Sequence, residues 1–155
     1  METQQEMEGK AQVHYQSWQE TYQEQLSESY LRDMSYEKCL AIARRWPDHV
    51  LVAKDGDRVI GFTAYGNCRD AGMDEYGEVM AIYLLAEYQK QGIGYRLMQS
   101  TLEHMPKHQK FVLWVLKGNQ KAIGFYERFG FSFDGCEKNL LIGTHVTEQR
   151  MIYQR

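Results

Sequence analysis

The stretch EYQKQGIGYRLMQS, residues 87–100, decides the fold, because it joins a strand-like run to a helix-like run through two glycines. The apolar run VMAIYLL, residues 79–85, ends just before it. Gly92 and Gly94 permit positive φ and let a ligand approach the backbone without a Cβ in the way. The amide groups of residues 91–95, at a helix N-terminus, would form a cradle for negatively charged oxygen. A plain turn from strand to helix fits the same two glycines, so this pattern alone leaves both interpretations open.

Two nucleotide-binding classes use a similar turn, and neither matches this chain. A P-loop requires Lys and then Ser or Thr after its last glycine, whereas Tyr95 and Arg96 follow Gly94. A dinucleotide-binding turn requires a third glycine, where this chain has Leu97. It also requires an acidic residue at the end of the next strand, where Lys117 stands. We therefore exclude both nucleotide-binding classes.

The segments on either side of the glycines predict a mixed sheet with helices. Two β-rich runs flank Asp55-Gly56, which predicts a hairpin within residues 49–66. A strand is expected over 76–85, a helix from Ile93 until Pro106 stops it, and a strand buried on both faces over 111–116. The remaining expected segments are helices at 9–26, 34–46 and 119–130, and strands at 131–143 and 146–155. This order indicates an α/β (α+β) fold, antiparallel at the front, with one parallel crossover at the glycines.

Three residues mark the ends of the expected helices, and four mark the buried face of the first one. Ser35 is the candidate N-cap of the helix at 34–46, and Asn119 is the candidate N-cap of the helix at 119–130. Gly130 is placed to end that last helix. In the first helix the spacing of Ala11, Tyr15, Trp18 and Tyr22 predicts one apolar stripe.

Length and composition describe an ordinary globular chain. Its 155 residues are 43% hydrophobic and 25% charged, which predicts a single domain over residues 1–155. A net charge of −3 does not favour nucleic-acid binding. Three scattered cysteines predict neither a disulfide framework nor a thiolate metal site. Since neither a signal peptide nor an apolar run of about 20 residues is present, we expect a cytoplasmic protein without a membrane partner.

Two motifs together resemble those of a known family. The residues from Gln89 to Gly94 have the pattern Q/R-x-x-G-x-G/A, which resembles the coenzyme A signature of the GNAT superfamily of N-acetyltransferases. The segment GNQKAIGFYERFGF, residues 118–131, resembles the second signature of that family. One helix and one buried strand separate the two motifs, as in the family. The opening helix is similar to that of a branch with bacterial polyamine acetyltransferases, including spermidine and spermine acetyltransferases.

The resemblance implies a twisted, mostly antiparallel sheet in which acetyl-CoA lies between two splayed parallel strands, here 78–84 and 111–116. It implies that backbone groups of Ile82 and Leu84, and the side chain of Asn119, bind the pantetheine arm. The signature that begins at Gln89 would hold the pyrophosphate on the amides of Gln91, Gly92, Ile93, Gly94, Tyr95 and Arg96. No metal is implied.

The resemblance also places two residues in catalysis. Tyr126 falls where the family has the general acid that protonates the coenzyme A sulfur as it leaves. Glu78, early on the strand beside the thioester, is the candidate base for the acceptor amine, directly or through water. A glutamate at the start of a strand is also commonly a solvated end residue, so both interpretations of Glu78 stay open.

Other residues have both a functional and an ordinary interpretation. His104 and His108 have metal-ligand spacing, but Pro106 interrupts their helix and no third ligand is near, so we expect no metal site. Arg96 and Arg128 would contact phosphates or serve as exposed helix charges. His14 is expected to be a core histidine. The aromatic residues Trp18 and Tyr22 would line the acceptor pocket or belong to the core, and Tyr76 is a further candidate for the pocket wall.

We therefore predict an acetyl-CoA-dependent N-acetyltransferase that acts on a small-molecule primary amine by direct attack in a ternary complex. The acidic segment RDAGMDEYGE, residues 69–78, favours a cationic, polyamine-like acceptor. The alternatives are a protein N-terminal or lysine acetyltransferase and a non-catalytic coenzyme A sensor. A homodimer is left open.

Overall fold

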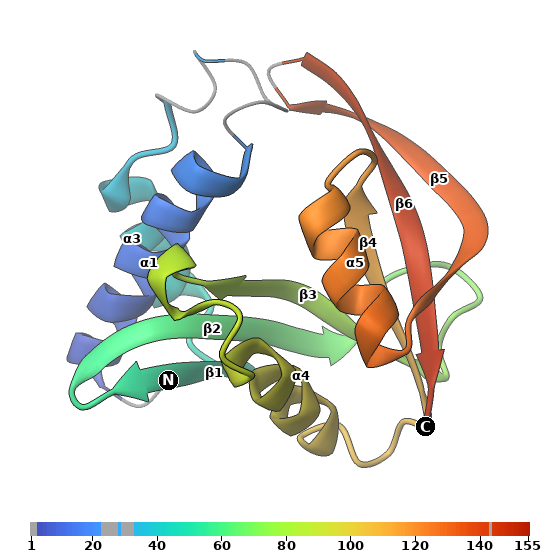
Figure 1. The fold of residues 1–155 in the computed structure, drawn as a ribbon, viewed down its shortest axis with the longest axis horizontal. Helices are drawn as coiled ribbons and strands as arrows, with labels where there is room; N and C mark the ends of the chain where they lie inside the picture. Colours follow the sequence, from blue (N-terminus) through green and yellow to red (C-terminus); the bar gives the residue numbers. More distant parts are fainter. Residues whose placement is uncertain (1–2, 23–27, 29–32, 143) are drawn as a thin grey trace.

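The computed structural model describes residues 3–22, 28, 33–142 and 144–155. It contains a six-stranded sheet with the order β1-β2-β3-β4-β6-β5 and flanking helices (Figure 1). The strands are β1 Val50–Asp55, β2 Arg58–Asn67, β3 Tyr76–Leu84, β4 Lys110–Leu116, β5 Ser132–Ile142 and β6 Thr144–Gln154. The helices are α1 Gln4–Tyr22, α3 Tyr36–Arg45, α4 Ile93–Glu103 and α5 Gln120–Phe129, with a short 3₁₀ turn η1 at Ala86–Tyr88.

The locally encoded elements lie where the sequence predicts them. The β1–β2 hairpin turns at Gly56, whose φ is +60°. Ser35 caps α3 by accepting a hydrogen bond from the Lys38 amide at 3.2 Å. Asn119 caps α5 in the same way, and Gly130 follows its last residue with a φ of +125°. These predictions are confirmed because turn and cap chemistry depends on a few neighbouring residues.

The prediction for the first helix is partly wrong. It begins at Gln4 rather than residue 9, and the expected residues 23–26 lie outside the described residues. Its buried side chains are Lys10, Ala11, Val13 and Ser17 rather than the single stripe expected. Because α1 packs against both β2 and α3, it has two buried sides, and one helical stripe does not describe it.

The sheet opens at the glycine crossover, as predicted. Strands β3 and β4 are the only parallel neighbours among the described strands, and they pair only from Tyr76–Glu78 to Lys110–Val112. Beyond Glu78 the two strands separate, while β3 stays paired with β2 and β4 with β6. A β-bulge at Met80, where Ala81 pairs with Ala64 but Val79 with Tyr65, falls where this separation begins. The result is a V-shaped gap in the middle of the sheet.

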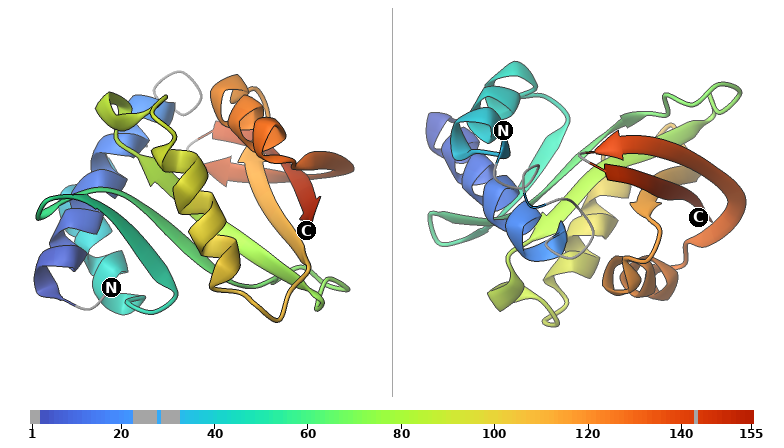
Figure 2. Two further views of the ribbon diagram at one scale, coloured as in Figure 1. Left: turned by 60° about the horizontal axis from the view of Figure 1, so that its bottom comes forward. Right: turned by 90° about the horizontal axis from the view of Figure 1, so that it is seen from above.

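Helices cover both faces of the sheet (Figure 2). Phe62 on β2 packs with Val13 of α1 on one face. The next residue, Thr63, points the other way, and its hydroxyl lies 2.8 Å from that of Thr101 on α4. The gap between β3 and β4 therefore connects the α1 face with the α4 and α5 face.

His14 of α1 lies in the aromatic core rather than in a ligand site. Its ring stacks on Tyr83 at 5.7 Å and contacts Phe62 edge-on at 5.7 Å. Burial, with a smaller contribution from Lys10, lowers the pKa of His14 to about 4. The imidazole is therefore neutral in the folded protein, as expected for a core histidine.

This buried imidazole predicts a loss of stability on acidification. Between its unfolded pKa, about 6.5, and its folded pKa near 4, the unfolded chain binds a proton that the folded chain does not. The free energy of unfolding should fall through this window by at most roughly 3 kcal/mol, and no further contribution is expected below it. Urea unfolding at pH 7, 5.5 and 4.5 measures this loss. His14→Phe should reduce the pH dependence, and an equal dependence in both proteins would contradict the prediction.

Candidate active site

A cavity of about 490 Å³ occupies the gap between β3 and β4. It takes lining residues from the end of α1, from β3, the glycine turn, β4, α5 and β6. Of the predicted site residues, it is lined by Ile82, Leu84, Gln89, Gly92, Gly94, Tyr95, Asn119 and Tyr126. Gln91, Ile93, Arg96 and Glu78 are not among its lining residues.

The glycine turn places free amide groups at one end of this cavity. Gly92 is the N-cap of α4 and has a φ of +81°, a conformation that favours glycine. The first helical hydrogen bond of α4 runs from the Arg96 amide to the Gly92 carbonyl at 3.1 Å. The amides of residues 92–95 precede that bond and have no acceptor within the helix. The prediction that Arg96 offers its amide to a ligand is therefore wrong, because that amide already belongs to the helix.

The exposed edge of β3 presents backbone groups to the cavity. The Leu85 amide donates to the Ile60 carbonyl at 2.9 Å, so Leu85 pairs with β2 by hydrogen bonds. Because hydrogen-bonded positions alternate in an antiparallel ladder, the backbone groups of Ile82 and Leu84 point away from β2. They face the gap, which suits a ligand that lies along β3.

Two amide side chains line the cavity, and each already makes one structural bond. Gln89 Nε2 donates to the Leu84 carbonyl at 2.9 Å, which ties the glycine turn to the end of β3. Among the described residues, Gln89 Oε1 is buried without a hydrogen-bond partner. Asn119, 8% exposed, accepts from the Ala122 amide at 3.3 Å to cap α5. Each side chain thus uses one end of its amide for the fold and has the other end available to a ligand.

Three cations line the cavity: Lys90 next to the glycine turn, Lys121 in the first turn of α5 and Arg128 in its last turn. Arg128 was one of two open candidates for phosphate contact, and the structure places it, rather than Arg96, at the cavity. The lysines were missed because a single lysine on a turn or helix has no distinguishing sequence pattern. Backbone amides and cations together suit a ligand with several phosphates.

The cavity lining includes the tyrosines Tyr22, Tyr83 and Tyr126. The hydroxyl of Tyr22 lies 3.3 Å from that of Tyr83. Burial raises the pKa of each of the three, most strongly for Tyr83 and Tyr126. All three hydroxyls therefore keep their protons at neutral pH and can donate hydrogen bonds.

The far end of the cavity reaches the α1 face. Leu113 and Val115 pack into the core beneath α4 and α5, whereas Leu116 packs against Trp18 and Tyr22 of α1. Since side chains alternate along a strand, Trp114 lies on the α1 face with Leu116. Both line the cavity, together with Glu148 of β6. No local sequence pattern predicts Trp114 and Glu148 as site residues, because only the pairing of β6 beside β4 brings them to the gap.

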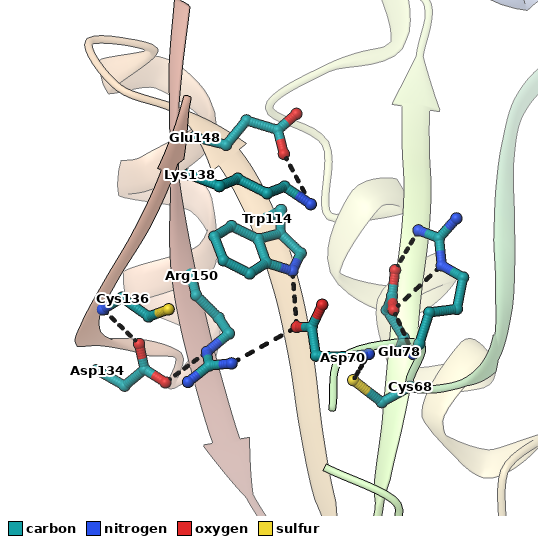
Figure 3. A network of polar contacts seen from close by, with 10 residues as sticks. Cys68, Asp70, Glu78, Trp114, Asp134, Cys136, Lys138, Glu148 and Arg150 are labelled. Atoms are coloured by element: carbon teal, nitrogen blue, oxygen red, sulfur yellow. Dashed lines mark hydrogen bonds and ion pairs between the residues drawn. The ribbon is translucent and has the colours of Figure 1, made fainter. Parts of the chain in front are cut away.

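The candidate base Glu78 lies apart from the cavity lining, on the paired part of β3 (Figure 3). Its side chain is 2% exposed, and its carboxylate accepts from the backbone amide of Arg69 at 3.1 Å and from the guanidinium at 2.5 Å. It is therefore a buried, paired carboxylate rather than a solvated end residue. Only a relay through water could connect it to a group in the cavity.

The expected aromatic lining is partly wrong. Tyr22 lines the cavity, and Trp18 packs behind it with ring centroids 4.9 Å apart. Tyr76 lies instead at the closed, paired start of β3, where its ring contacts Lys110. Tyr76 is excluded from the cavity because residues early on β3 lie where β3 and β4 are still paired by hydrogen bonds.

The acidic segment 69–78 uses much of its charge within the protein. Asp70 accepts a hydrogen bond from Trp114, Glu75 pairs with Lys110 at 3.0 Å, and Glu78 pairs with Arg69. The segment therefore attracts a cation less than its composition suggests.

His104 and His108 make ordinary hydrogen bonds, to the Ser100 carbonyl and to Asn67 and the Glu75 carbonyl. Within the described ranges, no group of three or more His, Cys, Asp or Glu side chains is placed to hold a metal ion. No described helix has the length and apolar character needed to span a membrane.

Comparison with known proteins places these features in a family. A model of the "Acetyltransferase (GNAT) family" matches residues 14–131. The "Uncharacterized N-acetyltransferase YuaI" of Bacillus subtilis (strain 168) is 33% identical over 126 residues, which span 77% of this chain and 70% of that protein. The crystal structure of PaiA N-acetyltransferase from Thermoplasma acidophilum in complex with coenzyme A has the same fold. It superposes with a TM-score of 0.73 at 23% identity, over 100% of this chain and 97% of that one.

Two further relatives differ in the acceptor that their names give. The "Spermine/spermidine N(1)-acetyltransferase" of Bacillus subtilis (strain 168) is 30% identical over 52% of this chain and 57% of its own length. The "N-alpha-acetyltransferase 30" of Schizosaccharomyces pombe is 35% identical over 56% of this chain and 59% of its own length. The two similarities are comparable, so they do not distinguish between acceptors.

Proposed function

The chain belongs to the GNAT family of acetyltransferases and is an acetyl-CoA-dependent N-acetyltransferase, and we propose that its acceptor is a small polyamine-like cation. The observation that supports this acceptor most strongly is the form of the cavity. The glycine turn contributes free amides to its lining, whereas α1, β4 and β6 contribute Tyr22, Trp114 and the carboxylate of Glu148. Aromatic faces and one carboxylate suit an ammonium group.

We propose that the donor lies along the exposed edge of β3. Its pyrophosphate would bind to the backbone amides of Gln91, Gly92, Ile93, Gly94 and Tyr95. The cations that line the cavity would assist. The backbone of Ile82 and Leu84 and the free ends of Gln89 and Asn119 would bind its pantetheine arm. The thioester would then lie between β3 and β4, near Tyr126.

In the proposed reaction the amine nitrogen attacks the thioester carbonyl carbon, and the carbon–sulfur bond breaks as the new carbon–nitrogen bond is completed. Tyr126 donates its hydroxyl proton, or a hydrogen bond, to the sulfur as negative charge develops there. The proton that the attacking nitrogen loses as the amide forms restores the Tyr126 hydroxyl, so the products are the amide and the free thiol. Burial raises the pKa of Tyr126, so the hydroxyl keeps its proton until negative charge develops on the sulfur.

The acceptor ammonium must first lose a proton, and we propose that Glu78 takes it through a water relay. Glu78→Gln is then expected to lower kcat by about tenfold at neutral pH. The loss should shrink as the pH rises towards the amine's own pKa of about 10, where the free amine forms without a base.

A pH profile of kcat for the wild type and for Glu78→Gln checks this step. The same profile is measured for Glu148→Gln, which removes a carboxylate that does line the cavity. If Glu78 only anchors Arg69, its replacement should lower the melting temperature and leave the shape of the profile unchanged. That outcome would remove Glu78 from the mechanism.

A protein N-terminus is the second candidate acceptor, favoured by the 35% identity to N-alpha-acetyltransferase 30. A non-catalytic sensor would need no tyrosine hydroxyl beside the thioester, so the place of Tyr126 in the cavity speaks against it. A cytoplasmic location and a homodimer stay predictions.

The test of the proposed function is thiol release from acetyl-CoA over a panel of amines, with products identified by mass spectrometry. The panel holds spermidine, spermine, cadaverine, aminoglycosides, amino acids and short peptides. Efficient turnover of a polyamine would support the proposal. Turnover of peptides alone would replace it with the protein acceptor, and acetyl-CoA binding without turnover would favour the sensor.

A further inference from the structure

Two residues that line the α1 end of the cavity already hold an ammonium group, which comes from the chain itself. Lys138 of β5 places its Nζ 4.1 Å from the centre of the Trp114 ring (Figure 3). The same Nζ lies 3.5 Å from Oε2 of Glu148. An aromatic face and a carboxylate beside it form a complete binding site for an alkylammonium ion.

Other groups hold the Trp114 ring in place independently of Lys138. The indole Nε1 donates to Asp70 at 3.0 Å, and Asp70 is also 3.6 Å from Nη1 of Arg150. Arg150 in turn pairs with Asp134 at 2.6 Å, and these three side chains are at most 23% exposed. The aromatic face is therefore preorganised and would persist if Lys138 moved away.

Lys138, in contrast, can leave easily. Its side chain is 40% exposed, and it does not line the cavity, whereas Trp114 and Glu148 both do. Lys138 and Glu148 are also cross-strand neighbours, so their contact alone would be an ordinary pair on the surface of a sheet. Such a pair contributes little to stability, so an ammonium entering from the cavity can replace it at low cost.

We infer that Trp114 and Glu148 form a subsite for a second ammonium group of the acceptor, which Lys138 occupies in the free protein. The inference rests on the proposed function, since it describes how the same cavity selects its acceptor. The reacting amine lies near Tyr126, and the second ammonium displaces Lys138. The enzyme therefore prefers diamines and polyamines to monoamines, and Lys138 competes with the acceptor.

Steady-state kinetics with spermidine and with butylamine test the subsite. Glu148→Gln should raise the KM for spermidine by about tenfold or more, and the KM for butylamine by a much smaller factor, because butylamine has no second ammonium to lose. Lys138→Gln should lower the KM for spermidine by roughly threefold, because it removes the competing ammonium. Glu137→Gln is the matched control: Glu137 lies on β5, pairs with Lys117 at 3.6 Å and does not line the cavity. It should leave both acceptors unaffected.

Calorimetric titration of spermidine into the protein with coenzyme A separates this inference from the proposed function, because it needs no turnover. Binding that Glu148→Gln weakens and Lys138→Gln strengthens supports the subsite, even if spermidine is not acetylated and the proposed function fails. Acetylation of spermidine with an unchanged KM in both variants would overturn the subsite and leave the proposed function intact. Absence of spermidine binding to the wild type would also overturn the subsite.

Discussion

Tyr126→Phe is expected to lower kcat by about 10²- to 10³-fold and to leave the KM for acetyl-CoA nearly unchanged. The hydroxyl would act only as the carbon–sulfur bond breaks, so its loss raises the transition-state energy without weakening donor binding. Some activity should remain. With reference pKa values of about 10 for tyrosine and about 8.5 for a thiol, full proton transfer is uphill by roughly 2 kcal/mol. Burial raises the pKa of Tyr126 and so increases this cost, which leaves a hydrogen bond to the sulfur as the main part of the effect.

Tyr153→Phe is the control for this result, because it removes a hydroxyl from the same hydrophobic cluster but outside the cavity lining. It should leave kcat unchanged. Burial raises the pKa of Tyr126, so the wild type should also lose no activity through tyrosine ionisation between pH 8 and about 10. Rapid-mixing measurements of thiol release would check both points, and a kcat that Tyr126→Phe leaves intact would exclude the hydroxyl as the acid.

Gly92→Ala is expected to weaken acetyl-CoA binding by between about ten- and a hundredfold, the second large effect. At a φ of +81° a Cβ meets no atom within 4 Å, so the substitution causes no clash. The penalty is conformational, about 1 to 2 kcal/mol, and the chain can relieve it by turning the following amides away from the ligand.

Gly56→Ala provides the matched control, because Gly56 also has a positive φ, +60°, and an open Cβ position, but lies in the β1–β2 turn. Both variants should lose similar stability in thermal unfolding. Calorimetry with acetyl-CoA should find weaker binding only for Gly92→Ala. Equal affinities in the two variants would show that the turn does not carry the pyrophosphate.

The predictable parts of this molecule are those whose causes lie close together in the sequence. The hairpin at Gly56, the capping by Ser35 and Asn119, and the strand–glycine–helix order each depend on a few adjacent residues. The donor end of the cavity shares this property, because the glycine turn and the Asn119 cap each lie within one connection. A short motif can therefore indicate both the fold and the donor.

The residues of the proposed acceptor end are not brought together by any local pattern. In the sequence, Trp114 is only one residue of an apolar strand, and Glu148 is only one polar residue of a predicted strand pair. They share the cavity because β6 pairs beside β4, with Leu116 opposite Glu148. The long-range pairing of β3 beside β4 likewise removes Tyr76 from the cavity.

Backbone preferences within short segments are enough to specify the mixed sheet, the parallel crossover and the glycine turn proposed to bind the donor. The tertiary structure alone decided where β3 and β4 separate and which carboxylate faces the gap. It also decided which ammonium lies on Trp114. These depend on strand register and on charges brought together from distant segments, which no local pattern records.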